Sequence, residues 1–309
     1  MSRRVALPKT AALERPLARR PRDHPWLWLV PLLAVTGAFY LYPALDVLRF
    51  SFTNASLFRP TYSYSLSSYA SLLRSPDFYY VLRITFIFTA GSVLLQLLLG
   101  LLIALAVHRG VIRNLPGSVF TRAVVLAAWI TPGVIIGLTW QLLLNEANYG
   151  IASYALTRLG LPKIPFLSNP IWALVSVTVA NIWRGTAFSM ILQYAGLQRI
   201  PHELYEAAEV DGATPLNSFF HITIPQLRPI LLINIILITI YTLNTFDMIL
   251  PLTGGGPGRA TEVIALHTYS RVFNSFDLGK GAALAGIMLV ISLIMTLIYS
   301  QLLRSEEAE

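Results

Sequence analysis

The sequence contains no cysteine and few charged side chains. Of its 309 residues, 12% are charged, against roughly 25% in an ordinary soluble domain. Without cysteine, the chain has neither a disulfide framework nor a thiolate metal site. Its five histidines are scattered and form no pair at helical spacing, so a zinc site made of histidines is not expected. We therefore expect no metal ligands in this chain.

Motifs that carry catalysis are missing as well. The sequence has no HExxH metalloprotease motif, no GxSxG nucleophile turn and no Walker phosphate-binding loop. No pair of acidic residues lies within a hydrophobic run at a spacing suited to hydrolysis inside a membrane. We therefore expect a protein that is not an enzyme, with no catalytic residues and no cofactor of its own.

Hydrophobic residues, by contrast, make up 55% of the chain and gather in long uncharged runs. Six runs are long enough to cross a hydrocarbon core of about 30 Å as helices. They cover about residues 26–50, 78–107, 119–144, 171–194, 229–252 and 282–303. The predicted fold is all-α, a polytopic membrane protein with six transmembrane helices in one domain at residues 26–303. Thr131-Pro132-Gly133 interrupts the third run, and the polar stretch 145–169 is expected to hold a short surface helix.

Positive charge lies mainly at the ends of the chain and beside the hydrophobic runs. Residues 1–25 form a basic tail, and residues 304–309 form a short second tail. A signal peptide is the alternative for the first tail, but its charged region is long and no small-residue cleavage site follows promptly. Six spans put both termini on one side, which holds more Lys and Arg than the other side and is therefore expected to be cytoplasmic. Because the basic residues flank hydrophobic spans, the net charge of +8 does not indicate nucleic-acid binding.

One polar segment separates the fourth and fifth hydrophobic runs. Residues 202–210 contain no helix breaker, and four residues share one face of a helix: Leu204, Ala207, Ala208 and Asp211. Gly212 can adopt the left-handed conformation that ends this helix. Thr214 can cap a second short helix with Pro215 at its first position, and Pro225 is expected to end that helix.

This segment closely resembles the signature cytoplasmic loop of ABC importer permeases. The resemblance lies in Glu-Ala-Ala, Asp-Gly-Ala and the Phe, Ile and Pro that follow, at Glu206, Ala207, Ala208, Asp211, Gly212, Ala213, Phe219, Ile222 and Pro225. It implies that residues 195–228 form a coupling loop that docks on an ATP-hydrolysing subunit and passes its motion to the membrane helices. An amphipathic helix on the membrane surface, or an ordinary loop between helices, is the alternative.

Two clusters of polar residues lie inside the hydrophobic runs, where an ionisable side chain needs a partner or a water-filled cavity. The fourth run holds Asn181, Trp183, Arg184 and Gly185, with Phe188 one turn beyond Arg184. The fifth run holds Tyr241, Asn244, Thr245 and Asp247, of which Tyr241 and Asn244 share a helix face. Aromatic rings beside amide and carboxylate groups suit a sugar, which offers apolar ring faces and hydroxyl groups.

Three features together resemble the carbohydrate-importing branch of the family, in particular its maltose-type "F" permease subunit. They are the signature loop, the run Leu-Thr-Gly-Gly-Gly-Pro-Gly at 252–258 and Asn-Thr-Phe-Asp at 244–247. By position, the resemblance implies a substrate cavity lined by Trp183, Gly185, Phe188, Asn244 and Thr245, with Asp247 nearby. The chain is shorter than that subunit, with no large external insert and no extra N-terminal helices. The pocket's location therefore carries over, and the identity of the sugar does not.

Several of these residues have a structural role as the alternative. Trp183 suits packing or the membrane interface, and Asn244 suits a hydrogen bond between helices. Arg184 suits an ion pair with Asp247 or a contact with a second permease. Asn181 is interpreted as a helix-packing residue, as is Gln193 further along the same run.

The sequence thus predicts a permease subunit of an ATP-driven, binding-protein-dependent importer for a carbohydrate or polyol, working by alternating access in a bacterial-type inner membrane. The resemblance implies these partners: a second homologous permease, two ATP-binding subunits that hold ATP and Mg²⁺, an extracytoplasmic solute-binding protein and membrane lipid. An anionic solute such as glycerol phosphate or a sulfonated sugar is the alternative, because Arg184 and basic outer loops would suit it. A secondary transporter or a membrane-anchored signalling protein leaves the signature loop unexplained.

Overall fold

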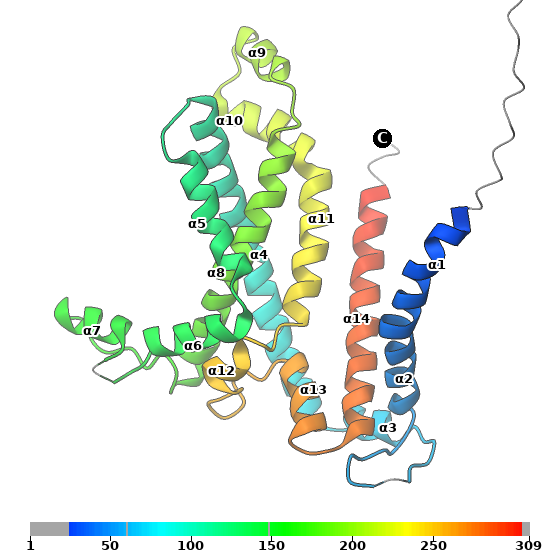
Figure 1. The fold of residues 1–309 in the computed structure, drawn as a ribbon. Helices are drawn as coiled ribbons and strands as arrows, with labels where there is room; N and C mark the ends of the chain where they lie inside the picture. The colour runs from blue at the N-terminus through cyan, green and yellow to red at the C-terminus, as the bar shows by residue number, and fades with distance from the viewer. Residues whose placement is uncertain (1–24, 60, 148, 305–309) are drawn as a thin grey trace, which may run out of the picture. The chain divides into compact units, whose positions relative to one another are not determined.

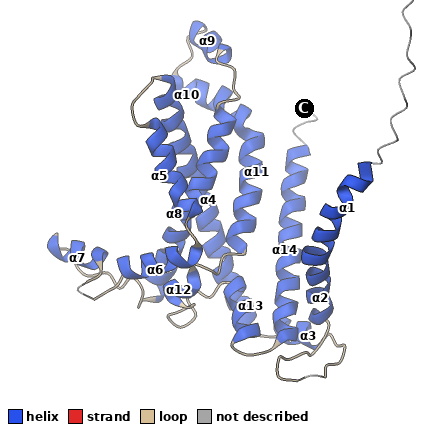
Figure 2. Cartoon of the chain, in the orientation of Figure 1, coloured by secondary structure: helices blue, strands red, loops and turns tan. Residues whose placement is uncertain are grey.

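The computed structural model describes residues 25–59, 61–147 and 149–304, so nearly all of both predicted tails lies outside the described residues. It divides into two compact units, Met1–Asp46 and Val47–Glu309. The described part of the first unit holds α1 (Pro25–Thr36), a π-helical turn (Gly37–Leu41) and the start of α2 (Tyr42–Ser51). The described residues contain two isolated β-bridges and no strand, in agreement with the predicted all-α class (Figure 2).

The second unit contains the remaining helices (Figure 1). They are α3 (Ser67–Leu73), α4 (Pro76–Ile112), α5 (Ser118–Ile130), α6 (Gly133–Leu143), α7 (Ile151–Arg158), α8 (Pro170–Leu197), α9 (Glu203–Val210), α10 (Pro215–Ser218), α11 (Ile224–Leu243), α12 (Ile249–Thr253), α13 (Ile264–Phe273) and α14 (Leu278–Arg304). Within this unit α9 and α10 lie at one end, toward which α14 runs, whereas α3, α7, α12 and α13 lie toward the other end.

Among the residues that the structure describes, four helical segments are long and apolar enough to cross a membrane: Trp28–Ser51, Pro76–Ile112, Pro215–Leu243 and Leu278–Gln301. The bent pair α5–α6 makes a fifth if it counts as one span. The remaining expected span, the fourth hydrophobic run, forms α8. This helix is not apolar enough to be counted with the others, although Arg184 is its one charged residue. Polar side chains such as Asn181 and Gln193 lower its hydropathy, and both are buried between helices. A helix enclosed by other helices needs less apolar surface than one that faces lipid.

The third hydrophobic run is interrupted at Thr131-Pro132-Gly133, as its sequence predicted, and the break is a sharp bend. Its two halves, α5 and α6, meet at an angle of 101°. Thr131 and Pro132 both have extended ψ angles, of 127° and 139°. Because a proline disfavours helical backbone at the preceding residue, α5 ends before Thr131 and the chain restarts as α6 at Gly133.

The fifth run also differs from its predicted bounds of 229–252. The helix ends at Leu243, and residues 244–248 are not helical before α12 begins. The Asn244 Nδ2 donates to the Ile240 carbonyl at 2.8 Å, and the Thr245 hydroxyl donates to the Tyr241 carbonyl at 2.9 Å. These side chains occupy carbonyl groups of the last turn, which favours termination of the helix there.

Pro225 does not end the second helix of the polar segment, contrary to expectation. Instead, a π-helical turn (Phe219–Thr223) joins α10 to α11, and the N–H of Ile224 bonds to the carbonyl of Phe219. A proline ring inside an α-helix clashes with the carbonyl four residues earlier, and the wider π turn relieves this clash. The same arrangement occurs at Pro43, which follows the π turn Gly37–Leu41. The helix is therefore continuous from Pro215 to Leu243.

Small residues bring α4 and α8 close together at the centre of the second unit. A Cβ added at Gly100 would lie 2.6 Å from the Cβ of Ser189, and one added at Gly185 would lie 2.2 Å from Oε1 of Gln96. Both distances are shorter than van der Waals contact; at Gly100 the neighbours include backbone atoms, so glycine is required there, and at Gly185 a larger residue would displace the Gln96 carboxamide. This packing places Gly185 and its neighbour Arg184 beside the first long helix of the unit.

Candidate functional site: a polar cavity at two helix breaks

A cavity of about 250 Å³ lies beside the end of α11 and is bounded by α4, α5 and α8. Six of the predicted substrate-binding residues line it: Arg184, Gly185, Tyr241, Asn244, Thr245 and Asp247. The other lining residues are Gln96, Trp129, Asn181, Ile238, Thr242 and Phe246. The cavity is therefore formed where α11 stops, close to the point where α5 bends into α6.

Arg184 and Asp247 form an ion pair at the cavity wall. Nη1 of Arg184 lies 3.3 Å from Oδ2 and 3.4 Å from Oδ1 of Asp247, and both side chains are partly exposed. The carboxylate also lies against Gly133, the first residue of α6, where an added Cβ would sit 1.8 Å from Oδ2. The start of a helix favours a negative charge. The pair thus connects α8, the 244–248 segment and α6.

Aromatic side chains form one wall of the cavity. The Tyr241 ring lies 5.3 Å from that of Trp129 and 5.7 Å from that of Phe188, and Phe188 lies 4.8 Å from Trp129. Phe188 therefore supports the two rings that line the cavity without itself lining it. Sequence reasoning missed Trp129. The signal for it was its position two residues before the Thr131-Pro132-Gly133 break.

Trp183 lies apart from the other predicted site residues. Its ring packs edge-on against Trp140 at 6.3 Å and is about half exposed. It lines a separate apolar groove with Val124 and Leu99. One residue along an α-helix turns the side chain by about 100°, so neighbours such as Trp183 and Arg184 face different sides of α8.

Buried amides lie beside the cavity and between its helices. Gln96 Nε2 donates to the Asn181 carbonyl at 3.2 Å, and Gln193 Nε2 donates to the Leu97 carbonyl at 3.2 Å. Gln193 thus links α8 to α4, as its interpretation as a packing residue implied. Asn181 also lines the cavity, and its Nδ2 has no hydrogen-bond partner among the described residues. Gln96 was missed, although it is the single carboxamide side chain of the long α4 helix.

The polar segment at the other end of α11 folds largely as its sequence predicted. α9 covers Glu203–Val210, Gly212 has a φ of +78°, and the Thr214 hydroxyl accepts from the N–H of Asn217 at 3.3 Å. Tyr205 Oη and Thr223 Oγ1 are 2.9 Å apart, which connects α9 to the π turn before α11. No residue of α9 or α10 is buried. Large apolar side chains are exposed on α9 (Leu204 and Val210), on α10 (Leu216) and on the π turn that follows (Phe220).

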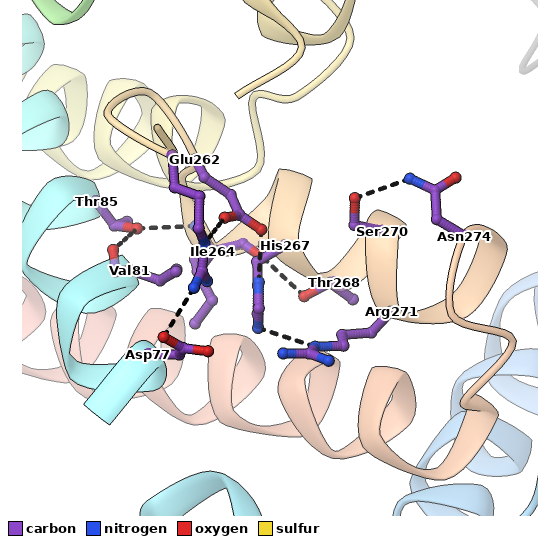
Figure 3. Close-up of polar contacts among 11 residues, drawn as sticks. Asp77, Val81, Thr85, Glu262, Ile264, His267, Thr268, Ser270, Arg271 and Asn274 are labelled. Atoms are coloured by element: carbon purple, nitrogen blue, oxygen red, sulfur yellow. Dashed lines mark hydrogen bonds and ion pairs between the residues drawn. The ribbon is translucent and has the colours of Figure 1, made fainter. Parts of the chain in front are cut away.

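A second polar network lies at the end of the unit that holds α13 (Figure 3). Arg259 pairs with Asp77 at 2.8 Å and with Glu262, and Glu262 lies 2.7 Å from Nδ1 of His267. Because Arg271 Nε donates to His267 Nε2 at 3.3 Å, Nδ1 is the nitrogen that donates to Glu262. Burial alone raises the pKa of Glu262, but hydrogen bonds and charges from His267 and Arg259 outweigh it and hold this pKa below its ordinary value.

None of these groups forms a metal site. Among the residues that the structure describes, no cluster of three or more His, Asp or Glu side chains is placed to hold a metal ion. The chemistry available in the cavity is therefore hydrogen bonding, aromatic stacking and one ion pair.

Comparison with known proteins extends over most of the chain. Residues 96–306 match the family described as "Binding-protein-dependent transport system inner membrane component". The chain is 37% identical over 275 residues to the trehalose/maltose transport system permease protein MalF of Thermococcus litoralis, covering 89% of this chain and 91% of that protein. It is 33% identical to the sulfoquinovosyl glycerol transport system permease protein SmoG of Agrobacterium fabrum, covering 91% and 90%. It is 30% identical to the sn-glycerol-3-phosphate transport system permease protein UgpA of Brucella abortus, covering 88% and 92%.

Solved structures resemble the fold as well. A chain from the crystal structure of a bacterial ABC transporter involved in the import of the acidic polysaccharide alginate matches with a TM-score of 0.76 and 21% identity. The match covers 91% of this chain and 94% of that chain. At this identity the likeness concerns the fold alone.

Proposed function

Because the chain belongs to the family of binding-protein-dependent transport system inner membrane components, we propose that it is the permease subunit of an importer for a carbohydrate or polyol. The observation that carries the choice of solute is the cavity, where Trp129 and Tyr241 offer ring faces beside the amides of Gln96 and Asn244. Such a combination of aromatic surface and placed polar groups suits a polyhydroxylated ligand. The relative named for trehalose/maltose is consistent with this class, whereas those named for sulfoquinovosyl glycerol and for sn-glycerol-3-phosphate keep the anionic alternative open.

The importer we propose contains more than this chain. Its partners are a second homologous permease, two ATP-binding subunits that hold ATP and Mg²⁺, an extracytoplasmic solute-binding protein and the lipid of the inner membrane. The exposed apolar side chains of α9 and α10, such as Val210 and Leu216, supply a surface for the ATP-binding subunit. In this arrangement the α9–α10 end and both termini of the multi-pass chain lie in the cytoplasm.

The continuous helix from Pro215 to Leu243 supplies the mechanical link in this proposal. Its 29 residues span roughly 40 Å at about 1.5 Å per residue. One end is α10, which belongs to the coupling segment, and the other end carries Tyr241 at the cavity wall. A displacement of α10 by the ATP-binding subunit therefore moves the cavity wall, which alternating access requires.

Reconstitution with the neighbouring permease, ATP-binding subunit and binding protein tests the solute class. We expect a neutral sugar or polyol to stimulate ATP hydrolysis and uptake, and Tyr241→Ala and Trp129→Ala to abolish that uptake. Trp183→Ala is the matched control, because this ring faces Trp140 instead of the cavity. An equal loss in Trp183→Ala would extend the site to that side of α8, as the family resemblance implied. Stimulation by no carbohydrate or polyol would contradict the proposal.

A pair of glycines tests the coupling role. Gly212 and Gly160 both have positive φ, of +78° and +68°, and an added Cβ at either meets nothing within 4 Å. Valine strains both backbones in the same way, since β-branched residues rarely adopt positive φ. We expect Gly212→Val to insert into the membrane yet lose solute-stimulated ATP hydrolysis, and Gly160→Val to keep it. Loss of stimulation in both variants, or in neither, would contradict a specific coupling role for the α9–α10 segment.

A further inference from the structure

We propose that the Arg184–Asp247 ion pair sets the charge of the solute that the cavity accepts. In the paired state, Asp247 neutralises Arg184, and the cavity selects uncharged polyhydroxylated solutes over anionic ones. Without the carboxylate, Arg184 becomes an anion-binding group. This inference rests on the proposed function, because it concerns the same cavity.

The first argument is the charge inventory of the cavity. Arg184 and Asp247 are the two charged residues among those that line it. The remaining lining groups are amides, hydroxyls, aromatic rings and apolar side chains. With the pair formed, the wall has no net charge, and an anion gains no net attraction there. Inside a membrane protein, where screening is weak, one uncompensated charge would dominate the choice of solute.

The second argument is that Arg184 keeps unused hydrogen-bonding capacity. Its contacts with Asp247, at 3.3 and 3.4 Å, both involve Nη1 and are long compared with about 2.7–2.9 Å for a strong charge-assisted bond. Nε of Arg184 is buried and has no hydrogen-bond partner among the described residues. A guanidinium group offers several N–H donors in a fork that fits phosphate, sulfonate or carboxylate oxygens. The group is thus able to bind an oxyanion once Asp247 no longer neutralises it.

The third argument is the position of the Asp247 carboxylate, which lies between Arg184 and the start of α6. It lies in the non-helical 244–248 segment, against the start of α6 at Gly133. A solute anion approaching Arg184 therefore meets the carboxylate that already contacts Nη1 of Arg184. Repulsion between the two anions lowers the affinity for the charged solute, while a hydroxyl group can bond to either partner of the pair.

A charge cycle in the assembled importer, purified in lipid nanodiscs, tests this inference. The variants are Asp247→Asn, Arg184→Gln and the double variant, which leave the cavity positive, negative and neutral respectively. The probes are trehalose and trehalose 6-phosphate, which differ by one anionic group, and their direct binding is measured without the binding protein. Direct binding is needed because the binding protein applies its own selection before delivery.

We expect Asp247→Asn to raise the ratio of phosphate-ester affinity to neutral-sugar affinity by at least about tenfold. Arg184→Gln should lower that ratio below the wild-type value, and the double variant should return close to it. If the pair has only a structural role, both single variants should bind both sugars more weakly to the same extent, and the ratio of the two affinities should not change. That result, or a wild-type preference for the phosphate ester lost in Arg184→Gln, would overturn the inference.

The failure of the inference is distinguishable from failure of the proposed function. If the wild-type importer binds neither probe and no carbohydrate or polyol stimulates its ATP hydrolysis, the proposed solute class fails. If neutral sugars are imported but the charge cycle leaves the affinity ratio unchanged, only the role of the ion pair fails. Should Asp247→Asn not assemble, Arg184→Gln and the double variant still compare a negative with a neutral cavity.

Discussion

The ion-pair network beside α13 and the ion pair at the cavity are built in opposite ways. Beside α13, Arg259 has two acidic partners, Asp77 and Glu262, and Glu262 also accepts from His267 (Figure 3). At the cavity, Arg184 and Asp247 are each other's charged partner among the described residues, and both of their long contacts pass through Nη1 of Arg184. In the first network the loss of one bond leaves others in place, whereas the second has no redundancy.

This difference indicates different tasks. The network beside α13 connects the start of α4 with the loop before α13, and the N–H of Ile264 donates to Thr85 Oγ1 of α4 at 2.8 Å in the same region. Several well-formed bonds that join two helices serve to hold them together. An isolated ion pair that is partly exposed and has long contacts contributes little to stability. It remains free to respond to a ligand, as expected for a binding cavity.

The largest effect is expected from Gly133→Ala, which disturbs the Arg184–Asp247 ion pair because Gly133 lies against Asp247. The added Cβ would lie 1.8 Å from Oδ2 of Asp247, so the carboxylate must leave the position in which it contacts Arg184. We expect uptake to fall at least about tenfold, with a stability cost of roughly 1–3 kcal/mol from overpacking. Uptake by the reconstituted importer and thermal unfolding of the purified complex measure the two effects.

Gly91→Ala is the matched control for this substitution. It also adds one methyl group inside a membrane helix, but its Cβ would meet only Thr178 Cγ2, at an ordinary 3.7 Å. Alanine is a better helix former than glycine by about 0.5–1 kcal/mol, so this variant should keep wild-type uptake and stability or gain slightly. Equal behaviour of the two variants would show that the close approach to Asp247 has no consequence.

The next largest effect is expected from Glu262→Gln, which removes a charge from the network beside α13. The change leaves Arg259 with Asp77 alone and weakens the bond from His267, at a cost of about 1–3 kcal/mol. The melting temperature should fall, while the ratio of affinities for neutral and anionic solutes should not change. Asp247→Asn is expected to do the reverse, with a smaller fall in melting temperature and a changed ratio. If both variants affect the same property, the two networks do not differ in task.

Lowering the pH tests the contribution of the Glu262 carboxylate to stability without a mutation. Because the folded state lowers the pKa of Glu262 below its ordinary value of 4.5, its carboxylate contributes stability that is complete above about that pH. This contribution is lost as pH falls through the lower, folded-state pKa. The melting temperature of the wild type should therefore approach that of Glu262→Gln as pH falls below 4.5. A constant difference between the two proteins down to low pH would contradict this role for the ionised carboxylate.

Sequence reasoning succeeded where the determinants are local. The turn at Gly212 and the cap at Thr214 depend on a few neighbouring residues, and both form as predicted. It failed where a helix was predicted to continue beyond the end of α11 at Leu243. The hydrophobic run 229–252 predicts helix at Asp247, yet no helix covers this residue, and it lines the cavity where α11 stops.

The parts of the cavity that come from other helices could not be predicted from local patterns. Gln96 lies in an unbroken apolar run, and nothing in its neighbours shows which helix it faces. Trp129 lies beside a recognised break, but the 101° bend that accompanies it is a property of the whole packed structure and not of Pro132 alone. Which residues meet across helices is decided by packing, because the same hydrophobic period is compatible with many arrangements.

The smallest effect is expected from Asp77→Asn, at the outer edge of the network beside α13. Asp77 lies 2.8 Å from Arg259, but its side chain is more than half exposed, so solvent screens the pair. Arg259 also keeps Glu262 as a partner. We expect a cost of about 0–1 kcal/mol, reduced further at high salt, as measured by thermal unfolding. A loss as large as that of Glu262→Gln would mean that Asp77 and Glu262 act as one unit and that the network lacks the redundancy that distinguishes it from the cavity pair.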